Sequence, residues 1–423
     1  MPNEATSIEL ASTEAPTADP RTTAVYPVSY VPGDEAEKTL DGIGLCLSGG
    51  GSRAMVFHLG ALVRLNELGL LHEVQRVSGV SGGSITGGVL GLGWHDLDWR
   101  ADPATGRQVA SNLQSIVLDP IEAFAAKSVD VHAVIEGILH PGENAADRLD
   151  RVFDEHLYHG KTLQDLPDDA AGPNKGPRPG PRFIFNATNL SSSVLWRFSK
   201  PYCWDWRVGE IEHPQFKVST AVAASAAFPP FFAPLELEVK PSDFTPGTGK
   251  GLELPEYQRK IRLADGGVYD NLALETVFKR YKTVFASDGG GQVSDEPSPP
   301  TDWVRETLRM TSVIDHQVRS LRKRLLIAAY ERKDREGAYW GIRQVFGDDP
   351  PPAPQPPPGR LPCPPEKTMA LANLATRLDG MTPEIRDRLV NWGYAVSDAA
   401  IRSSRMGTTL PPPKGFPRPG GVG

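Results

Sequence analysis

From about residue 42 onward, apolar residues occur first in one short run and then at helical spacing. Residues 42–49 (GIGLCLSG) form an apolar run bounded by glycine, which predicts a buried strand. After a series of glycines, apolar residues recur at helical spacing up to Gly69, which suits a helix end; they are Ala54, Phe57, Ala61, Leu65 and Leu68. The pattern predicts a strand, a tight turn and a helix.

The same order of elements recurs further along the chain. Residues 74–93 again combine a short apolar run, glycines and a helical pattern. Three more strands are predicted, at residues 182–189, 261–267 and 283–290. Two more helices are predicted, at residues 216–228 and 303–330. Strands that alternate with helices in this way predict an α/β fold, with a mostly parallel central sheet flanked by helices.

Proline, glycine and polar residues divide the chain into four parts. Residues 1–40 are polar and lack the charged start and apolar centre of a secretory signal, so we expect a disordered leader. Residues 41–347 carry the strand and helix patterns and form the main domain. Residues 348–366 are rich in proline and predict an extended linker. Residues 367–423 have a helical pattern, which predicts a helical C-terminal appendage.

The composition favours a globular protein and argues against several classes. The 423 residues are 39% hydrophobic and 23% charged, enough for a sizeable core. A formal net charge of -7 gives no support to a nucleic-acid partner. The three cysteines are far apart, which argues against disulfides or a zinc site and favours a reducing, cytoplasmic compartment. No apolar run reaches the roughly 18 residues of a spanning helix, so membrane contact is expected to be peripheral.

Ser81 lies in the stretch Gly79-Val80-Ser81-Gly82-Gly83, between a predicted strand and a predicted helix. Small residues on both sides allow the sharp strand-to-helix turn of a GxSxG nucleophile elbow, which exposes the serine hydroxyl. A flexible glycine-rich loop is the alternative. The apolar patterns on either side favour the turn, and Ser81 is therefore a candidate nucleophile.

A second glycine-rich turn, residues 48–53 (SGGGSR), also lies between a predicted strand and a predicted helix. Its backbone N–H groups can point into one concavity at the helix N-terminus, which suits an anion. That anion is either a phosphate or a developing oxyanion. The nucleotide-binding patterns GxxxxGK[ST] and GxGxxG do not occur at this turn, so the oxyanion is favoured.

Two aspartates, Asp265 and Asp288, are candidates for a general base. Each closes a predicted strand and is followed by glycines, so the local pattern does not choose between them. In parallel α/β folds the carboxyl ends of strands gather at one edge, where we expect these residues and Ser81 to lie. The histidines lie in helical or exposed stretches, and after Asp265 only His316 remains, within a predicted helix.

Five segments occur in the order and with the character of the patatin-like phospholipase family. They are LCLSGGGSRAMVFHLGALVRL, VSGVSGGS, FNATNLSSSVLWRFSK, VSTAVAASAAFPPFFAPL and LADGGVYDN, from about Gly42 to Leu274. The later helix VIDHQVRSLRKRLLIAAY is similar to a bacterial branch of the family. The resemblance implies a three-layer sandwich and a serine lipid acyl hydrolase, a phospholipase or esterase acting on acyl lipids, that needs no metal and no cofactor.

The resemblance also implies roles for individual residues. Ser81 would be the nucleophile and Asp265 the general base of a Ser-Asp dyad without histidine. Asp265 is favoured because its DGG motif is followed by a short turn and Asn271, whereas Asp288 leads into a polar loop where we expect it to stay solvated. The glycine-rich motif would supply the oxyanion hole through backbone N–H groups; its residues are Gly49, Gly50, Gly51, Ser52 and Arg53. Ala54 departs from the glycine that many members have there.

Two further groups of residues have both a structural and a functional interpretation. The aromatic residues Phe228, Phe231 and Phe232 either pack in the core or line a cleft for the acyl chain. The basic run at residues 319–324 is either a solvated helix face or a contact for anionic lipid headgroups; it comprises Arg319, Arg322, Lys323 and Arg324. A catalytically silent lipid-binding or scaffolding protein with the same fold remains the main alternative, and a nucleotide-binding protein is a more distant one.

Overall fold

The computed structural model describes residues 39–103, 105–127, 145–169, 179–229, 234–291, 295–346, 359–375, 380–404 and 410–423. Nearly all of the predicted leader, most of the proline-rich linker, and Phe231 and Phe232 lie outside the described residues. The proposed domain boundaries stay a prediction.

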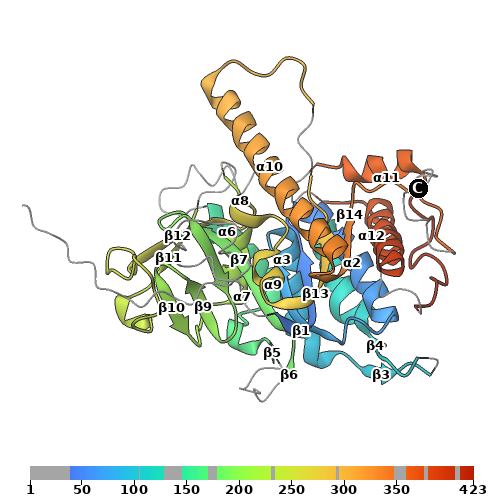
Figure 1. Ribbon diagram of the computed structural model, residues 1–423, viewed down its shortest axis with the longest axis horizontal. Helices are drawn as coiled ribbons and strands as arrows, with labels where there is room; N and C mark the ends of the chain where they lie inside the picture. Colours follow the sequence, from blue (N-terminus) through green and yellow to red (C-terminus); the bar gives the residue numbers. More distant parts are fainter. Residues whose placement is uncertain are drawn as a thin grey trace, which may run out of the picture.

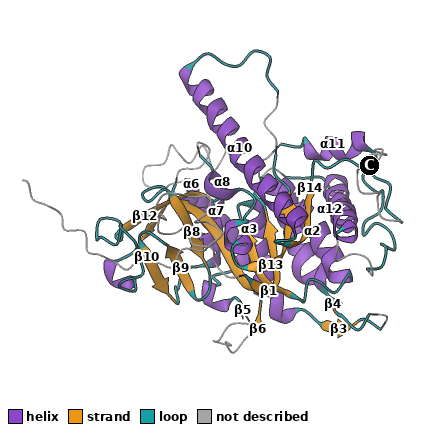
Figure 2. Ribbon diagram, viewed as in Figure 1, coloured by secondary structure: helices purple, strands orange, loops and turns teal. Residues whose placement is uncertain are grey.

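A ten-stranded mixed sheet forms the centre of the molecule, with helices on both sides (Figures 1 and 2). Its main path follows the order β10-β9-β8-β7-β2-β1-β13-β14, and β12 pairs with both β7 and β11. Neighbours from β7 to β14 along this path are parallel, whereas the pairs made by β8 to β12 are antiparallel. The predicted α/β fold with a mostly parallel central sheet is confirmed.

The strands of the large sheet are β1 (Leu40–Leu47), β2 (Val74–Gly79), β7 (Arg182–Asn189), β8 (Val194–Phe198), β9 (Tyr202–Asp205), β10 (Gly209–Glu212), β11 (Leu235–Glu238), β12 (Lys260–Asp265), β13 (Tyr281–Asp288) and β14 (Glu336–Gly341). Two small sheets pair β3 (Trp99–Ala101) with β4 (Gln108–Ala110) and β5 (Asp168–Asp169) with β6 (Pro179–Gly180). The α-helices are α2 (Gly51–Glu67), α3 (Gly82–Gly93), α4 (Asp119–Ala126), α6 (Ala145–Phe153), α7 (Val218–Ala226), α8 (Gly267–Asp270), α9 (Glu275–Phe278), α10 (Trp303–Arg332), α11 (Pro365–Ala372) and α12 (Pro383–Ser403).

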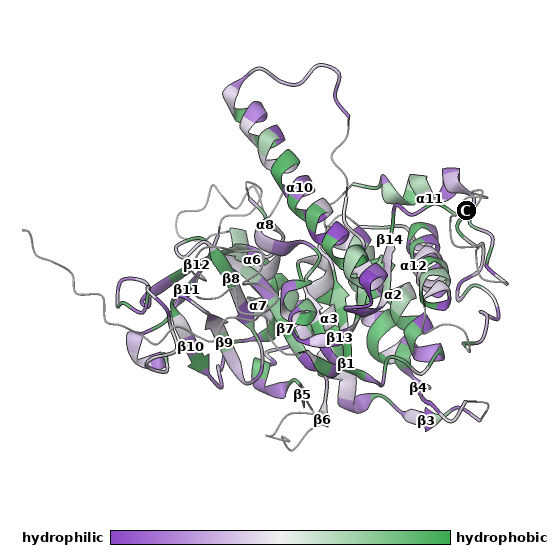
Figure 3. Cartoon of the chain, in the orientation of Figure 1, coloured by the Kyte–Doolittle hydropathy of each residue, from purple (hydrophilic) through white to green (hydrophobic). Residues whose placement is uncertain are grey.

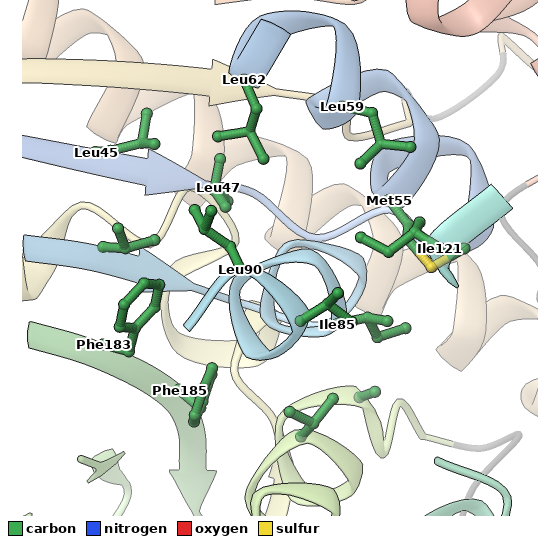
Figure 4. Packing of buried hydrophobic residues seen from close by; sticks show 14 of the residues in the cluster. Leu45, Leu47, Met55, Leu59, Leu62, Ile85, Leu90, Ile121, Phe183 and Phe185 are labelled. Carbon is green, nitrogen blue, oxygen red and sulfur yellow. The ribbon is translucent and has the colours of Figure 1, made fainter. Parts of the chain in front are cut away.

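The alternation of side chains along β13 divides the interior into two hydrophobic cores. Phe285 belongs to the larger core with residues of α2, α3 and α12, whereas Val284 and Ala286 belong to a second core with residues of α9 and α10. Figure 4 shows side chains of β1, β7, α2 and α3 facing one another in the larger core. Hydrophobic residues are concentrated on these central strands and helices (Figure 3). Helices therefore cover both faces of the sheet, which makes three layers.

Helix α12 packs closely against α2 and shares its core. A Cβ added at Gly60 would lie 1.9 Å from the Val390 carbonyl oxygen, so the two backbones meet without space for a side chain. Arg64 of α2 and Asp398 of α12 form a buried ion pair with an N–O distance of 2.8 Å. The predicted C-terminal helical pattern is confirmed for α11 and α12, and α12 is part of the packed structure that supports α2.

The close crossing of α2 and α12 predicts opposite effects for two glycine-to-alanine changes. Gly60→Ala should lower the free energy of unfolding by about 1–3 kcal/mol or more, because its methyl group overlaps the α12 backbone. Gly87→Ala in α3 is the matched control, since its Cβ would meet only ordinary contacts at 3.7 and 3.9 Å. It should be neutral or stabilise by up to about 1 kcal/mol. Urea unfolding of both variants measures this, and equal stabilities would contradict the crossing.

Candidate active site

Ser81 lies at the turn between β2 and α3 in a strained backbone conformation. Its φ is 51° and its ψ is -120°, a combination that non-glycine residues rarely adopt. A Cβ at Gly83 would lie 2.1 Å from the Leu47 carbonyl oxygen, so only glycine fits directly after the turn. The predicted sharp strand-to-helix turn is confirmed. The conformation is the one by which a serine hydroxyl is exposed at the start of a helix.

Asp265 reaches the same edge of the sheet from the opposite direction. Strand β2 ends opposite Phe185, but β7 continues to Asn189, and β12 pairs antiparallel with this extension. Asp265 is therefore the last residue of β12 and lies opposite Ala187, just beyond the end of β2. The expectation that it would follow a parallel strand is wrong, because the extension of β7 offers its edge to an antiparallel strand.

The Asp265 carboxyl group is buried, and hydrogen bonding from the nearby Ser81 side chain lowers its pKa. Its Oδ1 also accepts a hydrogen bond of 2.6 Å from the Gly267 N–H group. Burial raises the pKa of Asp265 to about 7, and the negative charge of Asp315 adds to this, whereas the two hydrogen bonds lower the pKa. The carboxyl group can therefore exchange a proton near neutral pH.

The glycine loop, residues 49–53, lies next to Ser81. The Gly49 N–H group donates to the Asn271 carbonyl at 3.0 Å, and a Cβ at Gly49 would lie 3.3 Å from the Ser81 Cβ atom. Gly50 has a φ of +143°, which favours glycine, and a Cβ there would lie 2.7 Å from the Gly289 carbonyl oxygen. The loop is thus held between Ser81 and the end of β13.

Backbone N–H groups at the start of α2 are available beside the serine. The Ala54 N–H group donates to the Gly50 carbonyl at 3.4 Å. The N–H groups of residues 50–53 have no acceptor within the part of the chain that the structure describes. The first amides of a helix lack an internal partner, so they can donate to an anion. Their role as an oxyanion hole stays a prediction.

The side chain of Arg53 is directed away from the nucleophile. Its Nε and Nη2 atoms donate to the Gly289 carbonyl at 3.3 and 3.2 Å, and Nη1 donates to the Ala372 carbonyl at 3.1 Å. Burial lowers the pKa of this guanidinium to about 10, and the nearby Arg343 lowers it further. Arg53 therefore connects the glycine loop to β13 and the C-terminal segment.

A hydrogen-bond network that the sequence did not indicate supports the serine turn. The Ser81 N–H group donates to Ser225 Oγ at 3.0 Å, and Ser84 Oγ lies 2.8 Å from the same atom. Ser225 Oγ in turn donates to the Asn186 carbonyl at 2.6 Å, and Asn186 Nδ2 donates to the Gly79 carbonyl at 2.8 Å. Ser225 and Asn186 are buried polar residues inside a predicted helix and a predicted strand. Their positions as polar residues inside these elements were the only indication that the sequence offered, and spacing alone could not link them to Ser81.

The histidines near the site serve other contacts. His58 is buried with its Nδ1 2.7 Å from Ser287 Oγ and its Nε2 3.0 Å from the Ser48 carbonyl oxygen. Burial lowers the pKa of His58 to about 4, so its ring is neutral, and its contact with Ser48 supports the start of the glycine loop. His316 lies on α10 beside a cavity that Asp288 also lines. These placements agree with a Ser81–Asp265 pair that has no histidine partner.

Asp288 is buried, so the expectation that it stays solvated is wrong. Its Oδ2 accepts a hydrogen bond of 2.7 Å from the Tyr339 hydroxyl, and its Oδ1 accepts one of 2.9 Å from the Gly290 N–H group. The sequence did not reveal that β14 pairs with β13 and brings Tyr339 over this carboxylate. Asp288 belongs to the α10 side of the sheet, and its partners differ from those of Asp265.

The predicted substrate-binding and basic residues have different environments. Phe228 is 38% exposed and follows Ala227, whose carbonyl accepts the Asp265 N–H group at 2.9 Å, so it lies at the margin of the site. Its role with the acyl chain stays a prediction. In the basic run, Arg322 pairs with Glu275 at 2.9 Å and with Asp270 at 3.5 Å. The run is therefore not one uniform solvated face.

The family model of patatin-like phospholipases matches residues 45–278, more than half of the chain. The chain belongs to the patatin-like phospholipase family. A search of the curated proteins found no match. None of the helices in the described ranges is both long and apolar enough to cross a membrane.

Among solved structures, this patatin-like chain is similar to human GIVD cytosolic phospholipase A2, at 17% identity and a TM-score of 0.36 over 66% of this chain and 51% of that one. A complex of the same human protein with methyl gamma-linolenyl fluorophosphonate matches at 16% identity and a TM-score of 0.41 over 84% and 57% of the two chains. VipD from Legionella pneumophila matches at 14% identity and a TM-score of 0.30 over 89% and 72%. The chain thus spans about half the length of the human enzyme chain.

The raised pKa of Asp265 predicts a pH-dependent effect on stability. Between about pH 4 and pH 7 the folded protein holds a proton that the unfolded chain has lost, so Asp265 lowers the free energy of unfolding as the pH rises. Asp265→Asn should therefore be more stable than the wild type at pH 8, by up to about 4 kcal/mol, and the difference should vanish near pH 4.

Thermal and urea unfolding at several pH values measure this difference. Asp398→Asn is the matched control, because Asp398 is equally buried but its carboxylate pairs with Arg64 and Arg402. Neutralising Asp398 should bring no gain in stability at pH 8. A constant difference between Asp265→Asn and the wild type across this pH range would contradict the raised pKa.

Proposed function

We propose that this patatin-like protein is a serine lipid acyl hydrolase, in which Ser81 is the nucleophile and Asp265 is the general base. The observation that carries the proposal is the pair itself. A half-buried serine in a strained turn lies close to a buried carboxyl group, beside helix N-terminal amides that have no acceptor among the described residues. These are the three parts that acyl transfer requires, namely a nucleophile, a base and donors for an oxyanion.

The reaction would proceed in two steps through an acyl-enzyme. Asp265 takes the hydroxyl proton as Ser81 Oγ attacks the ester carbonyl carbon, and the loop amides donate to the oxyanion. The bond to the alcohol oxygen then breaks, and Asp265 returns the proton to the leaving alcohol. In the second step, water gives a proton to Asp265 and attacks the acyl carbon. The bond between Ser81 Oγ and the acyl carbon then breaks, Asp265 returns the proton to Oγ, and the fatty acid is released.

The pKa of Asp265 supports its role as the base. An aspartate with its ordinary pKa of about 3.9 accepts a proton poorly at neutral pH. Burial raises the pKa of Asp265 to about 7, which balances the fraction ionised against the strength of the base.

Substitution of the two neighbouring serines tests the nucleophile. Ser81→Ala should lower kcat for p-nitrophenyl butyrate by roughly 10³ or more, because the attacking oxygen is lost. Ser84→Ala is the matched control: it removes a hydroxyl three residues away, and Ser225 Oγ keeps its bonds to Ser81 and Asn186. It should lose less than about ten-fold.

Fluorophosphonate labelling gives a second readout of the same assignment. Mass spectrometry should locate the adduct on the Ser81 peptide in the wild type and in Ser84→Ala, and find none in Ser81→Ala. Full turnover in Ser81→Ala would refute the nucleophile. A wild-type protein that is folded, unlabelled and inactive on every acyl ester tested would instead favour the catalytically silent lipid-binding protein.

The base can be tested by its pH dependence. Because Asp265 must be ionised in the free enzyme, kcat/KM should fall about ten-fold per pH unit below a midpoint near pH 7 and level off above it. Asp265→Asn should remove nearly all turnover at every pH while circular dichroism shows a retained fold. Ser84→Ala should keep the wild-type profile, and a flat profile from pH 5 to pH 8 in the wild type would assign the base elsewhere.

A further inference from the structure

A cavity of 240 Å³ lies on the α10 side of the sheet, separate from the Ser81–Asp265 pair. Asp288 and Gly290 line it from the end of β13, Arg319 and Lys323 line it from α10, and Arg343 lines it from the segment after β14. Asp288 faces this cavity because its side chain follows Val284 and Ala286 on the α10 face of β13.

The lining carries more positive than negative charge. The lining contains the three cations Arg319, Lys323 and Arg343 and one carboxylate, Asp288, which already accepts hydrogen bonds from Tyr339 and Gly290. A second carboxylate, Asp315 on α10, interacts with the charge of Arg319. The cavity therefore has an excess of cationic donors.

Several of these donors have no partner. Arg319 is half-buried, and its guanidinium makes no hydrogen bond or ion pair with any residue in the described ranges. The Nε atom of Arg343 is buried and likewise has no partner there, although its Nη2 donates to Asn373 Oδ1 at 2.7 Å. The Nζ atom of Lys323 lies 4.6 Å from the centre of the Tyr339 ring. Such donors at a cavity are suited to bind an oxyanion.

The guanidinium groups around the cavity repel one another. Burial lowers the pKa of Arg343, and the charge of Arg319 lowers it further. The pKa of Arg53, behind the glycine loop, is lowered by burial and also by Arg343 and Arg319. An anion between Arg319 and Arg343 would relieve this repulsion.

The cavity and the nucleophile lie on the two sides of one glycine loop. The Gly289 N–H group, next to the cavity lining, donates to Ser48 Oγ at 2.8 Å, and the Gly289 carbonyl lies against Gly50. Gly49, on the other side, lies against Ser81. In a glycerophospholipid, the phosphate is only a few bonds from the ester carbonyls, so such a lipid presents an anion and a scissile ester close together.

We propose that this cavity binds the phosphate group of a glycerophospholipid whose acyl ester lies at Ser81, with Arg319, Lys323 and Arg343 as its ligands. The proposal rests on the proposed function and adds to it the residues that hold the phosphate of the lipid. Arg53 is nearer to the glycine motif in sequence than these three residues, but its N–H groups already donate to the carbonyls of Gly289 and Ala372.

The rest of α10 favours a lipid over free phosphate as the source of the anion. Helix α10 projects from the body of the molecule beyond the cavity (Figure 1). Along this projecting part, Trp303 is 79% exposed, Met310 57% and Ile314 61%. Apolar side chains next to a phosphate-binding cavity suit a ligand that carries both an anion and acyl chains.

Calorimetry on the Ser81→Ala protein tests the cavity without hydrolysis. Two ligands are titrated, inorganic phosphate and a short-chain phosphatidylcholine below its micelle concentration. Arg319→Gln in this background should weaken phosphatidylcholine binding about ten-fold or more, because a charged hydrogen-bond donor is lost. Arg324→Gln is the matched control: it removes the same charge from the same helix, but Arg324 is exposed and does not line the cavity.

Each result of the titrations has a definite meaning. Phosphatidylcholine binding that depends on Arg319 and not on Arg324 supports the proposal. Equal losses in both variants would overturn it, since the effect would then be general surface charge. Arg319-dependent binding of inorganic phosphate without binding of phosphatidylcholine would also overturn it, in favour of a free-phosphate site.

Kinetics separate this inference from the proposed function. The ratio of kcat/KM for phosphatidylcholine to that for p-nitrophenyl butyrate should fall about ten-fold in Arg319→Gln and stay constant in Arg324→Gln. An unchanged ratio in Arg319→Gln would overturn the phosphate site even if Ser81 is the nucleophile. If instead Ser81→Ala kept full activity, the proposed function would fail, while the calorimetric test of the cavity would still stand.

Discussion

The candidate site depends on the contact between two strand-to-helix turns that lie back to back. A Cβ at Gly82 would lie 2.3 Å from the Gly51 carbonyl oxygen, so the turn that carries Ser81 and the glycine loop meet through their backbones. The Val80 N–H group donates to the Leu47 carbonyl at 3.1 Å and joins the two turns directly. This contact holds Ser81 in its strained conformation and places the N-terminus of α2 beside it. A larger residue at this contact would separate Ser81 from these amides, which are the proposed nucleophile and oxyanion donors.

Asp265 and Asp288 lie at different places in the sheet and therefore have different electrostatic environments. Asp265 is carried to the edge by β12 and is buried there, and this burial raises its pKa to about 7. Asp288 is carried to the α10 face by the alternation of β13 and lies among arginine and lysine side chains. Two Asp-Gly sequences that look alike are thus in opposite electrostatic environments. This difference suits Asp265 to its proposed role as a base and leaves Asp288 in a cationic cavity.

The C-terminal helix also contributes to the site, although it is far from it in sequence. Helix α12 packs on α2, and α2 begins at the glycine loop. The Arg53 side chain joins the same loop to the segment after α11. The position of the oxyanion donors therefore depends on the packing of residues near the end of the chain, which local sequence patterns around Ser81 do not include.

The local patterns of the sequence were sufficient for the central elements and the turns between them. Apolar runs, helical spacing and glycine predicted β1, β2, β7, α2 and α3 and the sharp turn at Ser81, because these features follow from interactions between near neighbours in the chain. Tertiary structure decided the rest. The antiparallel approach of β12, the burial of Asp288 under Tyr339, the partners of Arg53 and the Ser225–Asn186 network all join segments distant in sequence. Local patterns contain no information about such contacts, because the packing of whole elements decides which residues are buried and which strands pair.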